Sequence, residues 1–157
     1  MTPAINSAKK QKISHVIHEY THDVKATSYG NEAAEKLAVE PKKIFKTLVV
    51  SLDNKNLAVA IIPVLEQLSM KRVAKALDVK KAVMADKAVV ERTTGYVLGG
   101  VSPLGQKKLL LTVLDQSAES LDTLFVSAGK RGLEIELKPS DLIKLTRGKY
   151  AYISQTD

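Results

Sequence analysis

The chain has 157 residues, 45% of them hydrophobic and 26% charged, which is typical of one globular domain and excludes a disordered or collagen-like chain. Its 24 basic and 17 acidic residues give a net charge of +7 at pH 7, which favours an anionic partner. There is no cysteine, so the chain supplies no thiol nucleophile, thiolate metal ligand or disulfide.

The first part of the chain predicts a helix, a strand and a second helix. Threonine followed by proline is typical of a helix start and predicts a helix over residues 2–12. The alternating side chains of residues 14–20 predict a strand that ends in Tyr20. After a polar, turn-rich stretch, Asn31 is expected to cap a short helix over residues 31–38.

The middle of the chain predicts a hairpin and an amphipathic helix. Residues 43–52 and 56–64 are two strands separated by Asp-Asn-Lys, a moderate hairpin signal. Ser69 then caps a helix whose apolar residues recur at helical spacing. Three basic residues of this helix are expected to face outward: Lys71, Arg72 and Lys75.

The rest of the chain predicts short strands interspersed with helices. Strands are expected at 82–84, 109–114, 124–126, 133–137 and 150–153, with helices at 87–93 and from Pro139. There is no regular strand–helix–strand repeat, so the predicted fold class is α+β, a single domain with a mixed, curved sheet and flanking helices. No apolar run approaches the ~20 residues that span a bilayer, and we expect a cytoplasmic protein.

Positive charge is concentrated in one stretch. Between Lys36 and Lys81 there are ten basic and four acidic residues. A basic patch of this kind suits a nucleic acid, although a solvated lysine-rich surface explains it equally well. Few stacking aromatics accompany these charges, which disfavours a purely RNA-binding module.

Two features attract attention as candidate sites. Half of the eight glycines lie within residues 95–105, and backbone N–H groups of such a loop can hold a carbonyl oxygen or a phosphate. In the strand around Lys46, alternation places this lysine on an otherwise apolar face. Its ammonium group either reaches the sheet edge or lies in a cleft that accepts an anion, and the residues alone do not decide between them.

Several other chemistries are disfavoured. Proline follows Ser102 directly, which removes the N–H that would complete an oxyanion hole, so a serine hydrolase is not expected. The segment 127–132 lacks the spacing of a nucleotide-binding P-loop. His15, His18 and His22 lie in a strand-like segment without a carboxylate cluster, and no metal or cofactor is expected.

Four motifs in this order closely resemble the YbaK family of aminoacyl-tRNA deacylases, relatives of the editing domain of prolyl-tRNA synthetase. The resemblance covers almost the whole chain, and residues 1–157 are expected to be one editing domain. The motifs are Gly-Asn-Glu-Ala-Ala-Glu-Lys-Leu (30–37), Phe-Lys-Thr-Leu (45–48), Thr-Gly-Tyr-Val-Leu-Gly-Gly-Val-Ser-Pro-Leu-Gly-Gln-Lys (94–107) and Ser-Ala-Gly-Lys-Arg-Gly-Leu (127–133).

The resemblance implies a sheet curled into a partial barrel and a free-standing enzyme that hydrolyses Cys-tRNA(Pro), with Cys-tRNA(Cys) as a further substrate. It implies that Lys46 is the catalytic residue and holds the 3′-terminal nucleotide. The implied substrate-binding residues are Tyr20, Tyr29, Thr47, Gly99, Gly100 and Ser127, and the basic helix face of Lys71, Arg72 and Lys75 is expected to bind tRNA.

The resemblance also implies an unusual reaction. The thiol of the substrate's own cysteine attacks the ester carbonyl, and the resulting thiolactone is hydrolysed, so the enzyme contributes orientation and charge stabilisation. The expected partners are mischarged tRNA(Pro) and prolyl-tRNA synthetase. Three alternatives remain open: a deacylase of the same fold specific for Ala-tRNA(Pro), a non-catalytic tRNA-binding module, and a basic protein that binds an acidic protein.

Overall fold

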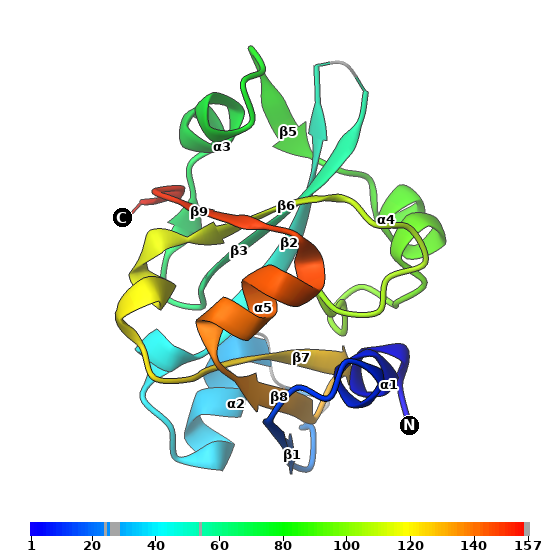
Figure 1. The fold of residues 1–157 in the computed structure, drawn as a ribbon, viewed down its shortest axis with the longest axis vertical. Helices are drawn as coiled ribbons and strands as arrows, with labels where there is room; N and C mark the ends of the chain where they lie inside the picture. The colour runs from blue at the N-terminus through cyan, green and yellow to red at the C-terminus, as the bar shows by residue number, and fades with distance from the viewer. Residues whose placement is uncertain (24, 26–28, 54, 156–157) are drawn as a thin grey trace.

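The computed structural model describes residues 1–23, 25, 29–53 and 55–155, without the side chain of Tyr29. Two short 3-10 helices, Pro41–Lys43 and Gln116–Ser120, connect longer elements. The α-helices of the described chain are α1 (Pro3–Lys10), α2 (Tyr29–Leu37), α3 (Met70–Ala76), α4 (Lys87–Thr94) and α5 (Pro139–Thr146) (Figure 1).

The strands form three open sheets in the described chain, and the α+β class is confirmed. The largest sheet has the order β5-β2-β3-β6-β9, the second β1-β8-β7, and the third pairs β10 with β4. The strands are β1 (His15–Glu19), β2 (Phe45–Leu52), β3 (Leu57–Pro63), β4 (Gln67–Leu68), β5 (Ala82–Met84), β6 (Leu111–Asp115), β7 (Leu124–Lys130), β8 (Leu133–Leu137), β9 (Lys149–Ala151) and β10 (Ser154–Gln155).

The five-stranded sheet is mixed and is covered on both faces. β2 pairs antiparallel with β3 and β5, while β3 and β6, and β6 and β9, run parallel. Along β3, Val59 and Ile61 pack into one core with α1, α4 and α5, whereas Ala58 and Ala60 pack into a second core with α3. Because side chains of a strand alternate between faces, α3 and α4 cover opposite faces of this sheet.

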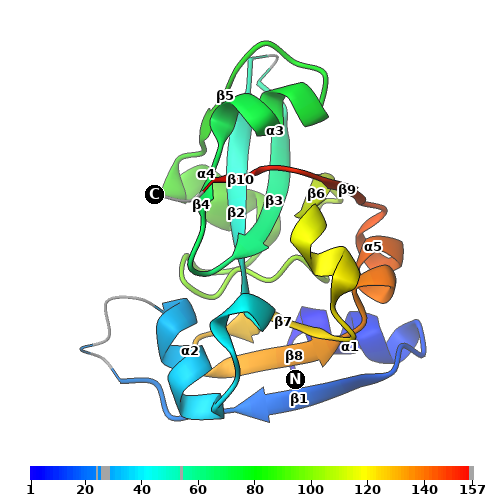
Figure 2. The ribbon, with the colours of Figure 1, turned by 90° about the vertical axis from the view of Figure 1, so that its left-hand side faces the viewer.

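The three-stranded sheet lies below the upright β2–β3 ribbon in the view of Figure 2. An isolated parallel bridge between Ile44 and Phe125 joins the start of β2 to β7. These two residues also form a small core with Ala33 and Ala34 of α2. The start of β2 therefore lies where the two sheets meet.

The predicted elements largely correspond to observed ones, because clear capping and periodicity marked them. Thr2 caps α1, and its hydroxyl accepts from the backbone N–H of Ile5 (3.3 Å); Ser69 caps α3 by accepting from the N–H of Arg72 (3.3 Å). The predicted cap at Asn31 is wrong, because α2 already begins at Tyr29 and Asn31 lies inside the helix.

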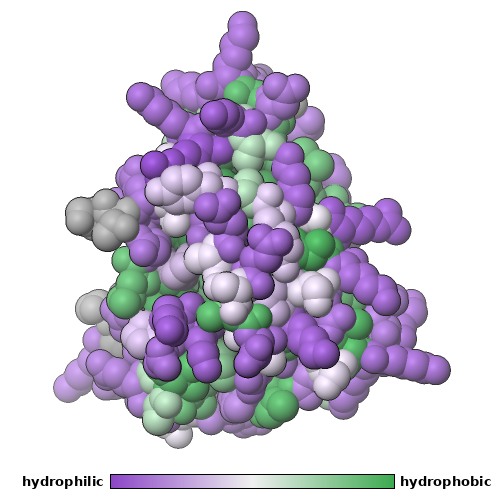
Figure 3. All heavy atoms as spheres, turned by 60° about the vertical axis from the view of Figure 1, so that its left-hand side comes forward, coloured by the Kyte–Doolittle hydropathy of each residue, from purple (hydrophilic) through white to green (hydrophobic). Residues whose placement is uncertain are grey.

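The surface is mainly hydrophilic on the face drawn in Figure 3, where hydrophobic atoms form scattered patches. Among the described residues, no helix combines the length and apolar character needed to cross a membrane.

Candidate active site

A cavity of about 420 Å³ lies beside the start of β2, where the two larger sheets meet. Its walls come from β2, β5, β7, β8 and the glycine-rich loop that follows α4. Five residues predicted from the sequence line it together: Tyr20, Lys46, Thr47, Gly99 and Ser127.

Lys46 reaches the cavity from the second position of β2. It pairs with Ile62 of β3, and its neighbours on the same face, Leu48 and Val50, are apolar. The half-buried side chain of Lys46 forms part of the cavity wall. Of the two hypotheses for this lysine, the structure therefore favours a position in a cleft that accepts an anion over one at the sheet edge. An ammonium group in a partly dry cleft interacts more strongly with an anion than it would in open water.

Thr47, the next residue of β2, also lines the cavity. Its hydroxyl oxygen is buried and has no hydrogen-bond partner among the described residues. A buried hydroxyl without a partner costs about 1–3 kcal/mol. A polar atom of a bound ligand would remove this cost, so Thr47 is well suited to contact a substrate.

Glu134 is a site residue that the sequence reasoning missed. It lies on β8, opposite Ser127 of β7 and His18 of β1, and it lines the cavity with a relative exposure of only 7%. Burial raises the pKa of its carboxyl group from 4.5 to about 8. Near neutral pH this carboxyl group is therefore mostly protonated and can donate a hydrogen bond or a proton.

Tyr20 follows β1 directly and is held in place by its backbone N–H, which donates to the carbonyl oxygen of Gly132 (2.9 Å). Burial, together with the nearby carboxylates of Glu134 and Glu32, raises the pKa of the Tyr20 phenol to about 12. The hydroxyl group stays protonated at physiological pH, so it offers the cavity a neutral donor.

The glycine-rich loop needs its two adjacent glycines for different reasons. Gly99 has φ 95° and lines the cavity. A Cβ at Gly100 would lie 2.8 Å from the Cα of Lys130, so glycine lets the loop approach β7 closely. The N–H of Gly100 donates to the carbonyl of Val97 (2.9 Å), which directs this group into the turn itself.

Ser127 places its hydroxyl beside the cavity next to a β-bulge of β7. The Ser127 oxygen accepts from the N–H of Gly129 (3.1 Å), which leaves the hydroxyl hydrogen able to donate to a ligand. The next residues along this segment, Lys130 and Arg131, are exposed and also line the cavity. They add positive charge at its rim, which the sequence reasoning did not assign to the site.

Not every predicted site residue lies at the cavity. Tyr29 begins α2, but its side chain is outside the described part of the structure. Lys71 and Lys75 are exposed on α3, away from the residues that line the cavity. Arg72 stacks on the ring of Tyr152 (3.9 Å to the ring centre) and donates to the backbone carbonyl of Ser154, so it fastens α3 to the end of the chain.

The three histidines of the N-terminal region are separated and take part in different contacts. His15 Nδ1 lies 2.7 Å from the carbonyl oxygen of Ile13, and His18 Nε2 lies 2.9 Å from a carboxylate oxygen of Glu136. His22 Nδ1 lies 2.7 Å from a carboxylate oxygen of Glu32. Within the described ranges, no group of three or more potential protein ligands could hold a metal ion.

Taken together, the cavity presents cations, neutral donors and an apolar wall to one ligand. Lys46 and the rim cations suit a phosphate, whereas the hydroxyl of Ser127 and the protonated carboxyl of Glu134 suit a carbonyl oxygen that gains negative charge. Ser102, the serine of the glycine-rich loop, is fully buried and receives the N–H of Leu104 (3.2 Å). The arrangement favours positioning and charge stabilisation over a serine nucleophile.

Comparison with known proteins identifies the family. Residues 23–145 match the family model described as "Aminoacyl-tRNA editing domain". The chain is 38% identical over 153 residues to the Enterococcus faecalis protein "Putative Cys-tRNA(Pro)/Cys-tRNA(Cys) deacylase EbsC", covering 98% of this chain and 93% of the relative. It is 26% identical over 118 residues to "Uncharacterized protein YwhH" of Bacillus subtilis, covering 75% and 74% of the two chains.

Solved structures share the fold. One is described as "Crystal structure of a putative trans-editing enzyme for prolyl tRNA synthetase"; it superposes with a TM-score of 0.82 at 20% identity, covering 97% of this chain and 92% of its own. A hypothetical protein of known structure superposes with a TM-score of 0.86 at 23% identity, covering 98% and 99% of the two chains.

Proposed function

Because this chain belongs to the aminoacyl-tRNA editing domain family, we propose that it is a trans-editing enzyme that removes cysteine from mischarged tRNA(Pro). The observation that supports this most directly is the cavity in which Lys46, Thr47 and Ser127 meet. We further propose that Cys-tRNA(Cys) is a second substrate, that the whole chain forms one editing unit, and that it acts in the cytoplasm.

In the proposed complex, the 3′-terminal nucleotide lies against Lys46, whose ammonium group binds its phosphate. The ester carbonyl lies deeper, near Ser127 and Glu134, which line the same cavity. Thr47 offers its otherwise unsatisfied hydroxyl to the sugar or the amino acid, and Gly99 allows the loop backbone to approach the aminoacyl group. These contacts hold the ester in a conformation that can react.

The proposed reaction uses the substrate's own thiol. The sulfur attacks the ester carbonyl carbon, a C–S bond forms, and the C–O bond to the ribose breaks. The ribose oxygen leaves as a hydroxyl by taking up a proton, for which the protonated carboxyl group of Glu134 is a suitable donor, and the thiol proton is released to solvent. Water then hydrolyses the thiolactone to free cysteine.

This chemistry explains selectivity without a size filter. A pocket that distinguishes two side chains by one methylene group gains only about 1–3 kcal/mol. A mechanism that needs a thiol on the substrate excludes alanine and proline because they have no nucleophile to offer.

We expect the purified protein to hydrolyse Cys-tRNA(Pro) faster than Ala-tRNA(Pro) or Pro-tRNA(Pro). The measurement follows loss of the ester bond across this panel under single-turnover conditions. Ser-tRNA(Pro), which replaces the thiol by a hydroxyl, is the matched control and should react far more slowly. Equal rates on cysteinyl and alanyl esters would favour an Ala-tRNA(Pro) deacylase, and no hydrolysis at all would favour a non-catalytic tRNA-binding module.

We also propose that the exposed lysines of α3 contact tRNA phosphates. Because Arg72 is engaged by Tyr152 and Ser154, Lys71 and Lys75 are the cations of this face that remain directed to solvent. Each phosphate contact contributes close to one unit to the slope of log K against log salt.

The variant Lys71→Gln/Lys75→Gln should therefore lower that slope by up to about two units, equally for every tRNA, in a titration monitored at several salt concentrations. An unchanged slope would show that this face is only solvated surface.

Prolyl-tRNA synthetase is the partner we propose for selection of tRNA(Pro). Its addition should increase deacylation of Cys-tRNA(Pro) when the concentration of the deacylase is limiting.

A further inference from the structure

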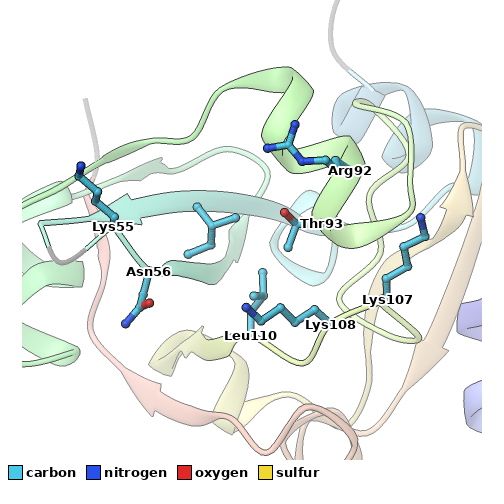
Figure 4. A pocket seen from close by; sticks show the side chains of 8 residues that line it. Lys55, Asn56, Arg92, Thr93, Lys107, Lys108 and Leu110 are labelled. Carbon is cyan, nitrogen blue, oxygen red and sulfur yellow. The ribbon is translucent and has the colours of Figure 1, made fainter.

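A second cavity, of about 310 Å³, is shown in Figure 4. It lies at the turn end of the β2–β3 hairpin, whereas the candidate active site lies at the start of β2. Three separate segments form its walls: the start of β3, the end of α4 and the chain after the glycine-rich loop. The eight lining residues are Lys55, Asn56, Leu57, Arg92, Thr93, Lys107, Lys108 and Leu110.

Half of these side chains are cationic, and the described lining contains no carboxylate. Lys55, Arg92, Lys107 and Lys108 are all exposed, and within the described ranges none of them forms an ion pair. The apolar side chain of Leu110 lies between them in Figure 4. Positive charges that line one cavity, with no carboxylate in its described lining, create a positive potential that attracts polyanions.

The position of Lys107 is fixed by its surroundings. Its backbone N–H donates to the carbonyl oxygen of Thr94 (3.0 Å), which closes the base of the glycine-rich loop. Gly95, which ends α4 with φ 84°, leaves room for the Lys107 side chain: a Cβ there would lie 3.1 Å from Lys107 Cγ. The loop that supplies Gly99 to the first cavity therefore also supplies Lys107 to the second.

The separation of the two cavities indicates the size of the ligand. Lys46 pairs with Ile62, and Leu57 of the second cavity lies five residues earlier on β3. At about 3.3 Å per residue this is roughly 17 Å. Phosphates of one strand of a duplex recur about every 3.4 Å along its axis, so a ligand that reaches both cavities spans several nucleotides. A mononucleotide is too short.

We propose that the cavity of Lys55, Arg92, Lys107 and Lys108 binds backbone phosphates of the acceptor stem of the tRNA whose aminoacylated 3′ end occupies the first cavity. The inference rests on the proposed function for the identity of this tRNA. The enzyme would then hold the tRNA at two sites, and the segment that supplies Gly99 to the first site also supplies Lys107 to the second.

The test uses Lys107→Gln/Lys108→Gln, which removes two charges but keeps part of each aliphatic stem. We expect about a ten- to sixty-fold loss of affinity for tRNA near 0.1 M salt and a salt slope lower by up to two units. Hydrolysis of a short aminoacylated oligonucleotide that has only the single-stranded 3′ end should keep its wild-type rate. The matched control is Lys10→Gln/Lys144→Gln, which removes two exposed lysines from α1 and α5.

Unchanged tRNA affinity and slope in Lys107→Gln/Lys108→Gln would overturn the proposal, as would an equal loss in the control. A loss of hydrolysis on the short substrate equal to that on tRNA would also overturn it, because the lysines would then act through the active-site loop. Pyrophosphate serves as the probe for binding of a small anion. If Lys107→Gln/Lys108→Gln no longer binds pyrophosphate but keeps its affinity for tRNA, the cavity binds a small anion and the proposal is overturned. Failure of the proposed function gives a different result, because the wild-type protein then hydrolyses neither the aminoacylated tRNA nor the short oligonucleotide. The titration with tRNA still shows whether Lys107 and Lys108 contribute to tRNA binding.

Discussion

Lys46→Ala is expected to lower the single-turnover rate of deacylation by about 10²- to 10³-fold while the protein stays folded. The magnitude is typical of removing one preorganised group that stabilises charge in a water-poor site. Stability should change little, because a lysine on the otherwise apolar face of β2 costs desolvation free energy that offsets what its stem contributes to packing.

Two further variants separate charge from shape at this position. Lys46→Met keeps an unbranched stem without the ammonium group and should be as inactive as Lys46→Ala. Lys46→Arg keeps the charge but spreads it over a planar group, so its rate should also fall. Lys80→Ala, a substitution at an exposed lysine outside the cavity, is the control for general loss of charge.

The measurement combines single-turnover hydrolysis with a thermal melt of each variant. Wild-type turnover in Lys46→Ala would show that this lysine has no role in the reaction. Activity that falls only in proportion to a lowered melting temperature would make its role structural.

Glu134→Gln is expected to remove a pH dependence of stability that the wild-type protein should show. The pKa of this carboxyl group is about 8 in the folded protein and 4.5 without burial. Between these values the folded state holds one more proton than the unfolded state, so the free energy of unfolding falls as pH rises, by up to roughly 1.4 kcal/mol per pH unit. Below about pH 4.5 and above about pH 8 the ionisation of Glu134 no longer changes the free energy of unfolding with pH.

Urea unfolding of both proteins at several pH values between 5 and 9 provides the measurement. Wild type should lose stability relative to Glu134→Gln as pH rises through this range, because wild type alone then carries the cost of an ionised buried carboxylate. Parallel curves would show that Glu134 titrates normally. Single-turnover rates on the same samples test its proton transfer, which typically contributes 10²- to 10⁴-fold to a rate.

The sequence was most informative where a local signal decided the structure. Thr2 and Ser69 cap their helices as predicted, and the alternation in β2 and β3 correctly indicated a hairpin. The cap at Asn31 failed because α2 begins earlier, at Tyr29. The pairing of β4 with β10 was not predicted, since two-residue strands have no periodicity and depend on a partner far away in the chain.

A site residue could be predicted where its residue type was unusual for its position in the strand pattern. A residue whose type fitted the pattern could not be recognised as part of the site. A lysine on an apolar strand face drew attention to Lys46. The alternation Leu-Glu-Ile-Glu-Leu of β8 makes Glu134 and Glu136 look like two solvent-facing acids, yet only Glu136 is partly exposed, where it contacts His18 and Thr123. Glu134 lies between His18 of β1 and Ser127 of β7 in the sheet, and the pairing of these strands is not visible in the sequence of β8 alone.

Charge counting had the same limit. The basic stretch from Lys36 to Lys81 directed attention to α3, but the structure uses Arg72 to fasten the chain end. The four-cation cavity combines Lys55 with residues at 92, 107 and 108, and only the fold brings them together. Counting charged residues within one stretch of the sequence therefore misses a basic cavity whose residues come from three separate segments.

The pairing of β1 with β8 determines when the active site is completed during synthesis. β1 is an edge strand whose neighbour in its sheet is β8, and the contact between His18 and Glu136 joins residues 118 positions apart. At a translation rate of about 5–20 residues per second, β1 waits on the order of 6 to 24 s for its partner strand. Tyr20 and Glu134 therefore come together only late in synthesis, so nascent chains that end before β8 should not be able to edit.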